Sequence, residues 1–283
     1  METNLRPFTR NGSSVLPPRT TLGVDQYLQS PNGRYKLYAQ NDRNLALYDG
    51  ANAVWVANAS AAYSSQVYPK RWSKGDVSQT YISHELTVYD LEHGRIWHTV
   101  NASVPVGDTF SAALRTYLQL QDDGNIVIID LFPVWYAPGS PLQDPSTPAT
   151  IIPPGTIINH GDSFEIGTSR LIFQNDGNLV FYGKNNKVIW ASYTQNKDGA
   201  FAAMQNDGQF VIYNSAHQPI WWTGTDAHPG AYARIQEDGS FAIVTDRVCW
   251  ARFGFTPTIK PARKIVRVSG NPYTEVWKPR DYS

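Results

Sequence analysis

The sequence contains little that could support covalent or metal-based stabilisation. Cys249 is the only cysteine among 283 residues, so no disulfide can form within the chain and a cysteine-based zinc site is excluded. The 24 basic and 24 acidic residues balance, so no overall charge attracts nucleic acid or an anionic membrane. We therefore expect a fold held together by packing, with no metal, no cofactor and no nucleic-acid partner.

Long apolar segments are also missing. No apolar stretch is long enough to span a bilayer, and the N-terminal METNLRPFTRNGSS lacks the apolar run of a secretory signal peptide. No segment keeps the helical apolar period of about 3.6 residues over a dozen positions. We expect an all-β chain that, if it acts outside its cell, is released without a cleavable signal peptide.

A polar frame recurs along the chain at every second position. In its most complete copy a β-strand would project five side chains from one face, while Leu179 and Phe181 turn toward a core. That copy consists of Gln174, Asp176, Asn178, Val180 and Tyr182. Four further legible copies begin at residues 40, 121, 205 and 236, and an eroded sixth copy begins at residue 81.

Each frame is followed 14 to 16 residues later by a tryptophan in a short apolar run. These tryptophans are Trp55, Trp97, Trp135, Trp190, Trp221 and Trp250. Six frames with six tryptophans indicate an internal repeat, and we expect these indoles in the core. Trp222 follows Trp221 directly, therefore faces the other way, and is the exception that we expect to be exposed.

The two halves of the sequence repeat each other. SVLPPRTTL at residue 14 corresponds to TIIPPGTII at residue 150, and a proline-rich run, a linker or edge segment, separates the halves. We predict a first domain at 1–147, a second at 148–256 and a C-terminal extension at 257–283. Frames 31 residues apart in the second domain predict three small antiparallel sheets around a pseudo-threefold axis, with one tryptophan per sheet at the centre.

The C-terminal extension is basic, with six basic against two acidic residues after Thr256. One interpretation is structural: the extension completes a sheet of the first domain, with Trp277 as its anchor. The functional interpretation is contact with a phosphate-rich bacterial surface.

The polar members of the frame suit the hydroxyls of a sugar. Two amides, a carboxylate and a phenol hydroxyl surround one small apolar contact, a combination of donors and acceptors that is typical of carbohydrate sites. The structural alternative is a hairpin turn with half-buried polar residues, because Asp-Gly-Asn is a common turn sequence. Five legible copies favour binding for the set, although not for any single copy.

The frame Gln-x-Asp-x-Asn-x-Val-x-Tyr, with its trailing tryptophans, resembles the monocot mannose-binding or bulb-type lectins over about residues 14–137 and 150–255. This resemblance implies two tandem type II β-prism domains, each of three four-stranded sheets. Two such domains without a signal peptide or the family's usual disulfide, followed by WARFGF and a tail with a late tryptophan, resemble a narrower group. That group is the lectin-like bacteriocins, the L-type pyocins and putidacins.

The lectin resemblance also implies a role for each frame residue. Asp176 and Asn178 would bind the axial 2-hydroxyl of a mannose-type ring. Gln174 would bind the 3-hydroxyl, Tyr182 the 4-hydroxyl, and Val180 would pack against ring carbons. A site with these fixed polar partners should accept D-mannose and D-rhamnose and refuse galactose.

The other frames rank by their departures from this pattern. The secondary site is Gln205, Asp207, Gln209, Val211 and Tyr213, where Gln209 replaces the asparagine. A third possible site is Gln40, Asp42, Asn44 and Tyr48, where Ala46 replaces the valine. The frames at 121 and 236 have lost the tyrosine, and we interpret them as structural.

Three functions compete at this point. The bacteriocin resemblance implies a monomeric toxin that binds a D-rhamnose or D-mannose polysaccharide of lipopolysaccharide. It also implies an outer-membrane barrel assembly protein as partner and killing of related Gram-negative bacteria at their outer surface. The alternative is a non-toxic lectin for adhesion or recognition. A glycosidase is disfavoured, since no frame offers a second carboxylate at working distance and we assign no catalytic residue.

Overall fold

The computed structural model describes residues 5–42, 44–57, 78–90, 94–99, 109–145, 147–254, 266–268, 271–273 and 276–277. Strands dominate these residues, and the helical pieces are short: α2 (Thr109–Ala113) and the 3-10 turn η1 (Lys184–Asn186). Within the described residues no helix is long and apolar enough to cross a membrane. The expectation of an all-β chain is confirmed.

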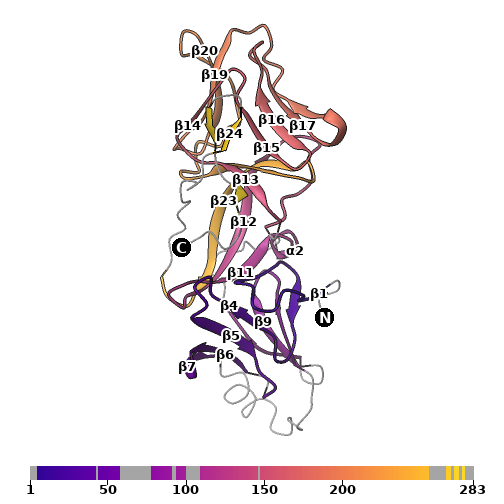
Figure 1. The fold of residues 1–283 in the computed structure, drawn as a ribbon, viewed down its shortest axis with the longest axis vertical. Helices are drawn as coiled ribbons and strands as arrows, with labels where there is room; N and C mark the ends of the chain where they lie inside the picture. Colours follow the sequence, from indigo (N-terminus) through magenta and orange to yellow (C-terminus); the bar gives the residue numbers. More distant parts are fainter. Residues whose placement is uncertain are drawn as a thin grey trace. The chain divides into compact units, whose positions relative to one another are not determined.

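The chain forms two compact units that interleave in sequence (Figure 1). Unit 1 contains the chain up to Asp130 and a segment that begins at Arg247, whereas unit 2 contains Leu131–Asp246 and the strands beyond residue 259. Neither unit is one continuous range. The domain ranges 1–147 and 148–256 therefore remain sequence predictions.

Unit 1 is built from three sheets, which are antiparallel apart from the pairing of β1 with β3. The first sheet has the order β1 (Arg6–Pro7), β3 (Thr20–Leu22), β8 (Ser78–Ile82), β9 (Leu86–Asp90) and β10 (Gly94–His98). The second has the order β4 (Tyr27–Gln29), β5 (Tyr35–Ala39), β6 (Leu45–Asp49) and β7 (Asn52–Val56). The third consists of β2 (Val15–Leu16), β11 (Thr116–Leu120), the first half of β12 (Ile126–Tyr136) and the second half of β23 (Phe241–Ala251).

Unit 2 repeats this plan. Its first sheet has the order β15 (Ser163–Ile166), β16 (Ser169–Phe173), β17 (Leu179–Tyr182) and β18 (Val188–Ala191). Its second has the order β14 (Thr156–Asn159), β19 (Gly199–Met204), β20 (Phe210–Asn214) and β21 (Pro219–Trp222). The third consists of the second half of β12, the first half of β23, β22 (Tyr232–Gln236), β13 (Ala149–Ile152) and β26 (Val276–Trp277), while β24 (Val266–Val268) and β25 (Asn271–Tyr273) form a separate hairpin.

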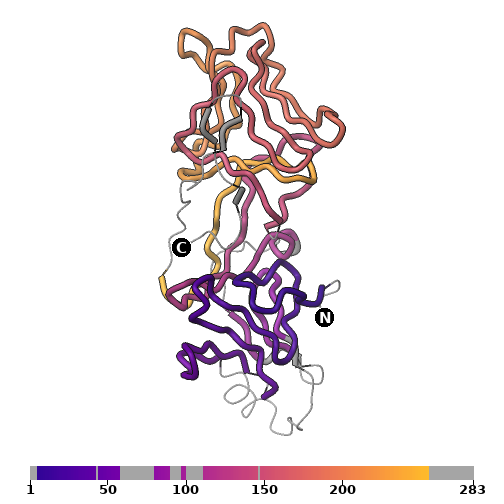
Figure 2. The backbone as a smooth tube through the Cα atoms, in the orientation of Figure 1, coloured from indigo at the N-terminus to yellow at the C-terminus, as the bar shows by residue number. Residues whose placement is uncertain are grey.

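Strands β12 and β23 each pass through both units, so the units exchange terminal strands. In unit 2 the amide of Ala137 donates to the carbonyl of Phe241 at 2.9 Å, and in unit 1 the amide of Arg252 donates to the carbonyl of Ile126 at 2.9 Å. The tube in Figure 2 shows the two strands running side by side. Each unit therefore completes its third sheet with a strand from a distant part of the sequence.

The tryptophans form one triad in each unit, as the repeat predicts. In unit 1 the ring centre of Trp55 lies 6.0 Å from that of Trp97 and 6.4 Å from that of Trp250. In unit 2 the three ring-centre distances lie between 5.3 and 6.0 Å for the triad of Trp135, Trp190 and Trp221. Each sheet contributes one indole, so the expected central arrangement is confirmed.

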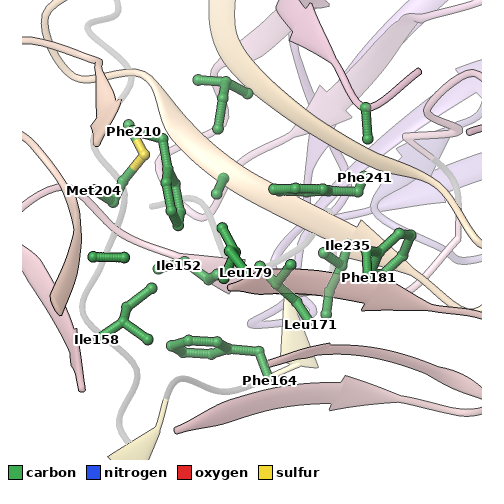
Figure 3. Packing of buried hydrophobic residues seen from close by; sticks show 14 of the residues in the cluster. Ile152, Ile158, Phe164, Leu171, Leu179, Phe181, Met204, Phe210, Ile235 and Phe241 are labelled. Carbon is green, nitrogen blue, oxygen red and sulfur yellow. The ribbon is translucent and has the colours of Figure 1, made fainter. Parts of the chain in front are cut away.

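Buried apolar residues such as Leu171, Leu179 and Phe241 form the core of unit 2 (Figure 3), and the tryptophan triad packs in the same cluster. Phe241 lies 5.4 Å from Trp135, and apolar residues from all three sheets surround them. The strand exchange decides which triad each indole joins: Trp135, which follows the frame at 121, belongs to unit 2, and Trp250 belongs to unit 1.

The C-terminal extension does add a strand to a sheet, but the prediction that this sheet belongs to the first domain is wrong. β26 pairs with β13, a strand of unit 2, with Thr150 opposite Val276. In the third sheet of unit 1, β23 already occupies the place beside β12. The remaining basic residues of the extension, apart from Arg267 on β24, lie outside the described residues.

Candidate sugar-binding sites

The complete frame is not one continuous strand, which corrects the sequence-based expectation. β17 begins at Leu179, so Val180 and Tyr182 lie on the strand, whereas Gln174, Asp176 and Asn178 lie in the turn between β16 and β17. The turn is a short one because Gly177 adopts φ +79°, a left-handed conformation that favours glycine. A Cβ at this position would lie 2.9 Å from the carbonyl oxygen of Gly199.

The same three hydrogen bonds organise the frames at 174, 205 and 40. The glutamine Nε2 donates to the tyrosine hydroxyl at 3.0, 2.6 and 2.8 Å in that order. The aspartate Oδ1 accepts the amide two residues further on, at 3.0, 2.9 and 2.9 Å. The backbone N–H of the glutamine donates to the backbone carbonyl four residues further on at 2.8 Å in all three frames. The frames are thus three copies of one preorganised arrangement, carried by three different sheets.

These bonds leave ligand-binding capacity on the polar side chains. Gln174 uses one amide hydrogen on Tyr182, so its Oε1 and the phenol proton can still bind other groups. Asp176 is exposed and uses Oδ1 on its own turn, which leaves Oδ2 as an acceptor. Val180 is only 3% exposed, whereas Leu179 and Phe181 point into the core of unit 2. The site can therefore donate to and accept from several hydroxyls above a small apolar floor.

Asn178 is held by two groups that the sequence analysis did not single out. Its Oδ1 accepts from the Ser192 hydroxyl at 3.0 Å and from the Thr194 amide at 3.2 Å. The Thr194 hydroxyl in turn donates to the Gly177 carbonyl at 2.6 Å. Because Oδ1 is occupied, the Nδ2 group of Asn178 is the part that remains to donate to a ligand.

We call the two hydroxyl residues that hold Asn178, Ser192 and Thr194, the cradle. The frame at 205 keeps a cradle of this kind but lacks the asparagine. The hydroxyl oxygens of Thr223 and Thr225 lie 2.7 Å apart, the same distance as those of Ser192 and Thr194. The Thr225 hydroxyl donates to the carbonyl of Gly208 at 2.6 Å. The side chain of Gln209 is half-buried, and no hydrogen bond joins its amide to Thr223 or Thr225. The cradle is therefore built for a side chain one methylene shorter.

A signal for the cradle was present in the sequence. Ser192 and Thr194 follow Gln174 by 18 and 20 residues, and Thr223 and Thr225 follow Gln205 by the same intervals. A search for hydroxyl residues at a fixed distance behind each glutamine would have found them. The corresponding positions behind Gln40 are residues 58 and 60, which lie outside the described residues.

The frame at 40 lies in an open pocket of about 700 Å³ in unit 1. Its lining includes Gln40, Asp42 and Tyr48, together with Tyr38 and Lys36. The Tyr38 and Tyr48 rings meet edge to face with centres 5.9 Å apart. Ala46 is fully buried, so the tyrosine rings replace the missing valine as the apolar part of this pocket.

Arg34 lines this pocket and forms an ion pair with Asp49. Arg34 donates to both oxygens of Asp49, at 2.9 and 2.6 Å. The hydrogen bond from Arg34 holds the pKa of the Asp49 carboxyl below its usual value. On the frame side of the pocket Asp42 uses Oδ1 to accept the backbone amide of Asn44, which leaves Oδ2 as an acceptor for a ligand.

In the frames at 121 and 236 the other polar members are buried and only the aspartates are exposed, which fits a structural role. Gln121 and Asn125 are 3% and 2% exposed. Gln236 donates to the carbonyl of Asp144 at 2.8 Å, and Ser240 donates to the carbonyl of Pro141 at 2.8 Å. The proline-rich run thus covers the frame at 236 and leaves no room for a ligand there.

No group of three or more histidine, cysteine, aspartate or glutamate side chains in the described part of the chain could hold a metal ion. The polar residues gathered at the three frames are neutral amides, phenols and one carboxylate per frame. Such a set forms hydrogen bonds to hydroxyl groups and has no preferred geometry for a cation.

No protein-family model and no curated protein matches the sequence. Lectins are among the solved structures that are similar to the chain. A two-domain, fetuin-binding agglutinin from Scilla campanulata is 20% identical over 82% of this chain and 93% of its own, with a TM-score of 0.46. The mannose-specific agglutinin of snowdrop (Galanthus nivalis) is 33% identical over 38% of this chain and 98% of its own, with a TM-score of 0.33. A monomeric mannose-binding lectin from Gastrodia elata is 34% identical over 36% of this chain and 93% of its own, with a TM-score of 0.32.

The sheets and triads define the fold class. Each unit has three small sheets around a central tryptophan triad, which is the β-prism arrangement expected from the sequence. The chain is thus an all-β protein of two β-prism units, and its structural neighbours include mannose-binding lectins and a two-domain, fetuin-binding lectin.

Proposed function

We propose that this chain is a lectin for mannose-type sugars. Its principal site is the frame at 174, its secondary site the frame at 205, and a third possible site the frame at 40. In the principal site, Asp176 and Asn178 form hydrogen bonds to the 2-hydroxyl. Gln174 binds the 3-hydroxyl, and Tyr182 binds the 4-hydroxyl. Val180 supports the ring carbons.

One observation carries this proposal: in three separate sheets the frame glutamine donates to the frame tyrosine. The aspartate bond alone would not carry it, because the buried frames at 121 and 236 form that bond as well. A turn needed only for folding has no reason to keep a glutamine and a tyrosine in contact eight residues apart. Fixed polar partners also supply selectivity, because a sugar that leaves one of them unpaired is penalised.

Each site alone should bind weakly. About four net hydrogen bonds of ~1 kcal/mol each correspond to roughly millimolar affinity for one monosaccharide. Useful binding then requires a polymer whose repeated epitopes engage more than one site, since linked sites raise the effective concentration. We therefore propose a polysaccharide as the physiological ligand.

We further propose that the chain is a lectin-like bacteriocin. The support is the tandem layout, the WARFGF segment and the basic extension with its late tryptophan. The ligand would be a D-rhamnose or D-mannose polysaccharide of lipopolysaccharide. An outer-membrane barrel assembly protein of the target would be its partner. The protein would act as a monomer, released without a cleavable signal peptide, at the outer surface of related Gram-negative cells.

Killing assays on a panel of related strains test this proposal. Purified protein should kill some strains, and the double variant Asp176→Ala, Asp207→Ala should lose most of that activity, because both sites lose their carboxylate. Full activity of the double variant would count against sugar docking at these two sites as part of killing. Binding to mannose-type sugars without killing any strain would favour the alternative, a non-toxic lectin for adhesion or recognition.

A further inference from the structure

A row of apolar side chains crosses the sheet that carries the frame at 205. In the strand register Ile157 lies opposite Ala203, Ala203 opposite Val211, and Val211 opposite Trp222. Directly paired residues project from the same face of a sheet, so all four share the face of Val211. The two ends of the row are open to solvent, with Ile157 63% and Trp222 55% exposed. The apolar floor of this frame thus continues beyond Val211 to the edge of the sheet.

The corresponding rows at the other two frames end differently. At the frame at 174 the row is Ser163, Ile172, Val180 and Ala191. At the frame at 40 it is Tyr27, Tyr38, Ala46 and Val56. The position beside the central residue on the last strand is therefore Ala191, Val56 or Trp222. Of the three frames, only the one at 205 has an aromatic ring there.

Trp222 is not needed for the core. Its neighbour Trp221 faces inward and completes the triad of unit 2, with its ring centre 5.3 Å from that of Trp190. Trp222 faces outward, and it stacks on no other ring within the described parts of the chain. Its indole is thus available to a ligand, with a flat apolar face and an N–H donor.

We propose that Trp222 is the platform for a second sugar ring at the frame at 205. This inference rests on the proposed function, in which the same frame binds the first ring. Cross-strand neighbours stand about 5 Å apart, so the indole begins where the floor under the first ring ends. Its flat apolar face packs against the carbon-bearing face of the next residue of an oligosaccharide. Gln209 weakens the contact with the first ring, and Trp222 compensates by recognising the linked ring.

The frames at 174 and 205 then differ in selectivity. The frame at 174 has Ala191 at this place and binds one terminal ring through its polar groups. The frame at 205 binds at least two linked rings, so it prefers an oligosaccharide over the free monosaccharide. A polymer then binds the frame at 174 through a chain end and the frame at 205 through internal residues.

The test isolates the frame at 205 in the full chain with the background variants Asp42→Ala and Asp176→Ala. Calorimetric titration with D-mannose and with a mannotriose gives a ratio of the two affinities. Adding Trp222→Ala should weaken mannotriose binding roughly three- to tenfold and change D-mannose binding less than twofold. Trp222→Phe should retain most of the preference. Leu142→Ala removes another exposed apolar side chain, from the segment that covers the structural frame at 236, and should change neither affinity.

A further substitution, Asp207→Ala in the same background, separates the possible failures. If Asp207→Ala leaves mannotriose binding unchanged, the frame at 205 is not a sugar site and both proposals fall for it. If Asp207→Ala weakens binding but Trp222→Ala does not, only the platform is refuted. An equal loss of D-mannose and mannotriose binding in Trp222→Ala would also refute it, because the indole would then support the first ring alone.

Discussion

Replacing Gln209 by asparagine should repair the frame at 205. The cradle for an asparagine is already present, since Thr223 and Thr225 stand where Ser192 and Thr194 hold Asn178. In the Gln209→Asn variant the shorter side chain should place Oδ1 on the Thr223 hydroxyl and turn Nδ2 toward the ligand. The fold should not change, because Gln209 is only half-buried and its backbone bond to Asp207 remains.

The expected gain follows from the number of bonds restored. One additional hydrogen bond to the 2-hydroxyl contributes about 1 kcal/mol, which corresponds to roughly fivefold tighter binding. Calorimetric titration with D-mannose in the Asp42→Ala, Asp176→Ala background measures this site alone. Gln209→Ala is the matched control and should show no gain. If Gln209→Asn binds no tighter than the parent, the cradle does not position a ligand donor and the roles assigned to Asn178 and Ser192 are wrong.

Three further predictions concern the fold. Gly208→Ala should lower the unfolding temperature far more than Gly230→Ala: both glycines have positive φ, but a Cβ at Gly208 would approach the carbonyl of His228, whereas one at Gly230 meets nothing within 4 Å. Equal losses of stability in thermal denaturation would contradict this steric account. Burial raises the pKa of the Cys249 thiol from 9.0 to about 12, with a smaller contribution from the charge of Asp130. The stability that this neutral thiol contributes is therefore present below pH 9 and is lost as the pH rises toward 12. Chemical denaturation at several pH values should show this loss in the parent and a smaller one in Cys249→Ala. Trp135→Ala should destabilise unit 2 and Trp250→Ala should destabilise unit 1, each by about 3–5 kcal/mol, because the exchanged strands place these indoles in those cores. Hydrogen exchange resolves the two units, and the opposite pattern would refute the strand exchange.

The repeat made much of the fold predictable. A tryptophan at a fixed distance behind each frame can be central in every sheet only if the sheets are arranged around a common axis, and the two triads have this arrangement. The exposure of Trp222 followed from strand alternation, because its neighbour Trp221 is an inward-facing residue. These features depend on local periodicity, which a single sequence displays.

The strand exchange could not be predicted for a physical reason. The frames at 121 and 236 and their trailing strands are copies of one another, so β12 can complete a sheet in either unit with similar contacts. Local sequence therefore does not distinguish the exchanged from the unexchanged pairing. The same limit explains the error over the extension, whose edge strand β26 joins unit 2 through backbone bonds that carry little sequence signature.

The polar half of each site was only partly predictable. The alternating spacing suggested one strand, but the left-handed Gly177 turn brings Gln174, Asp176 and Asn178 together by a different route. The members of the frame were found because they repeat. Ser192 was missed because it lies 18 residues away and reaches Asn178 only through the pairing of β17 with β18.

Calorimetric titration of the intact chain with D-mannose, D-rhamnose and a D-rhamnose-containing polysaccharide, beside Asp176→Ala, tests the central claim most directly. The account predicts weak binding of both monosaccharides, tighter binding of the polymer and a loss of affinity for all three in the variant. Galactose is the negative control and should give no heat of binding. Absence of binding to every one of the three ligands, or binding that Asp176→Ala leaves unchanged, would contradict the claim that the frames are sugar sites.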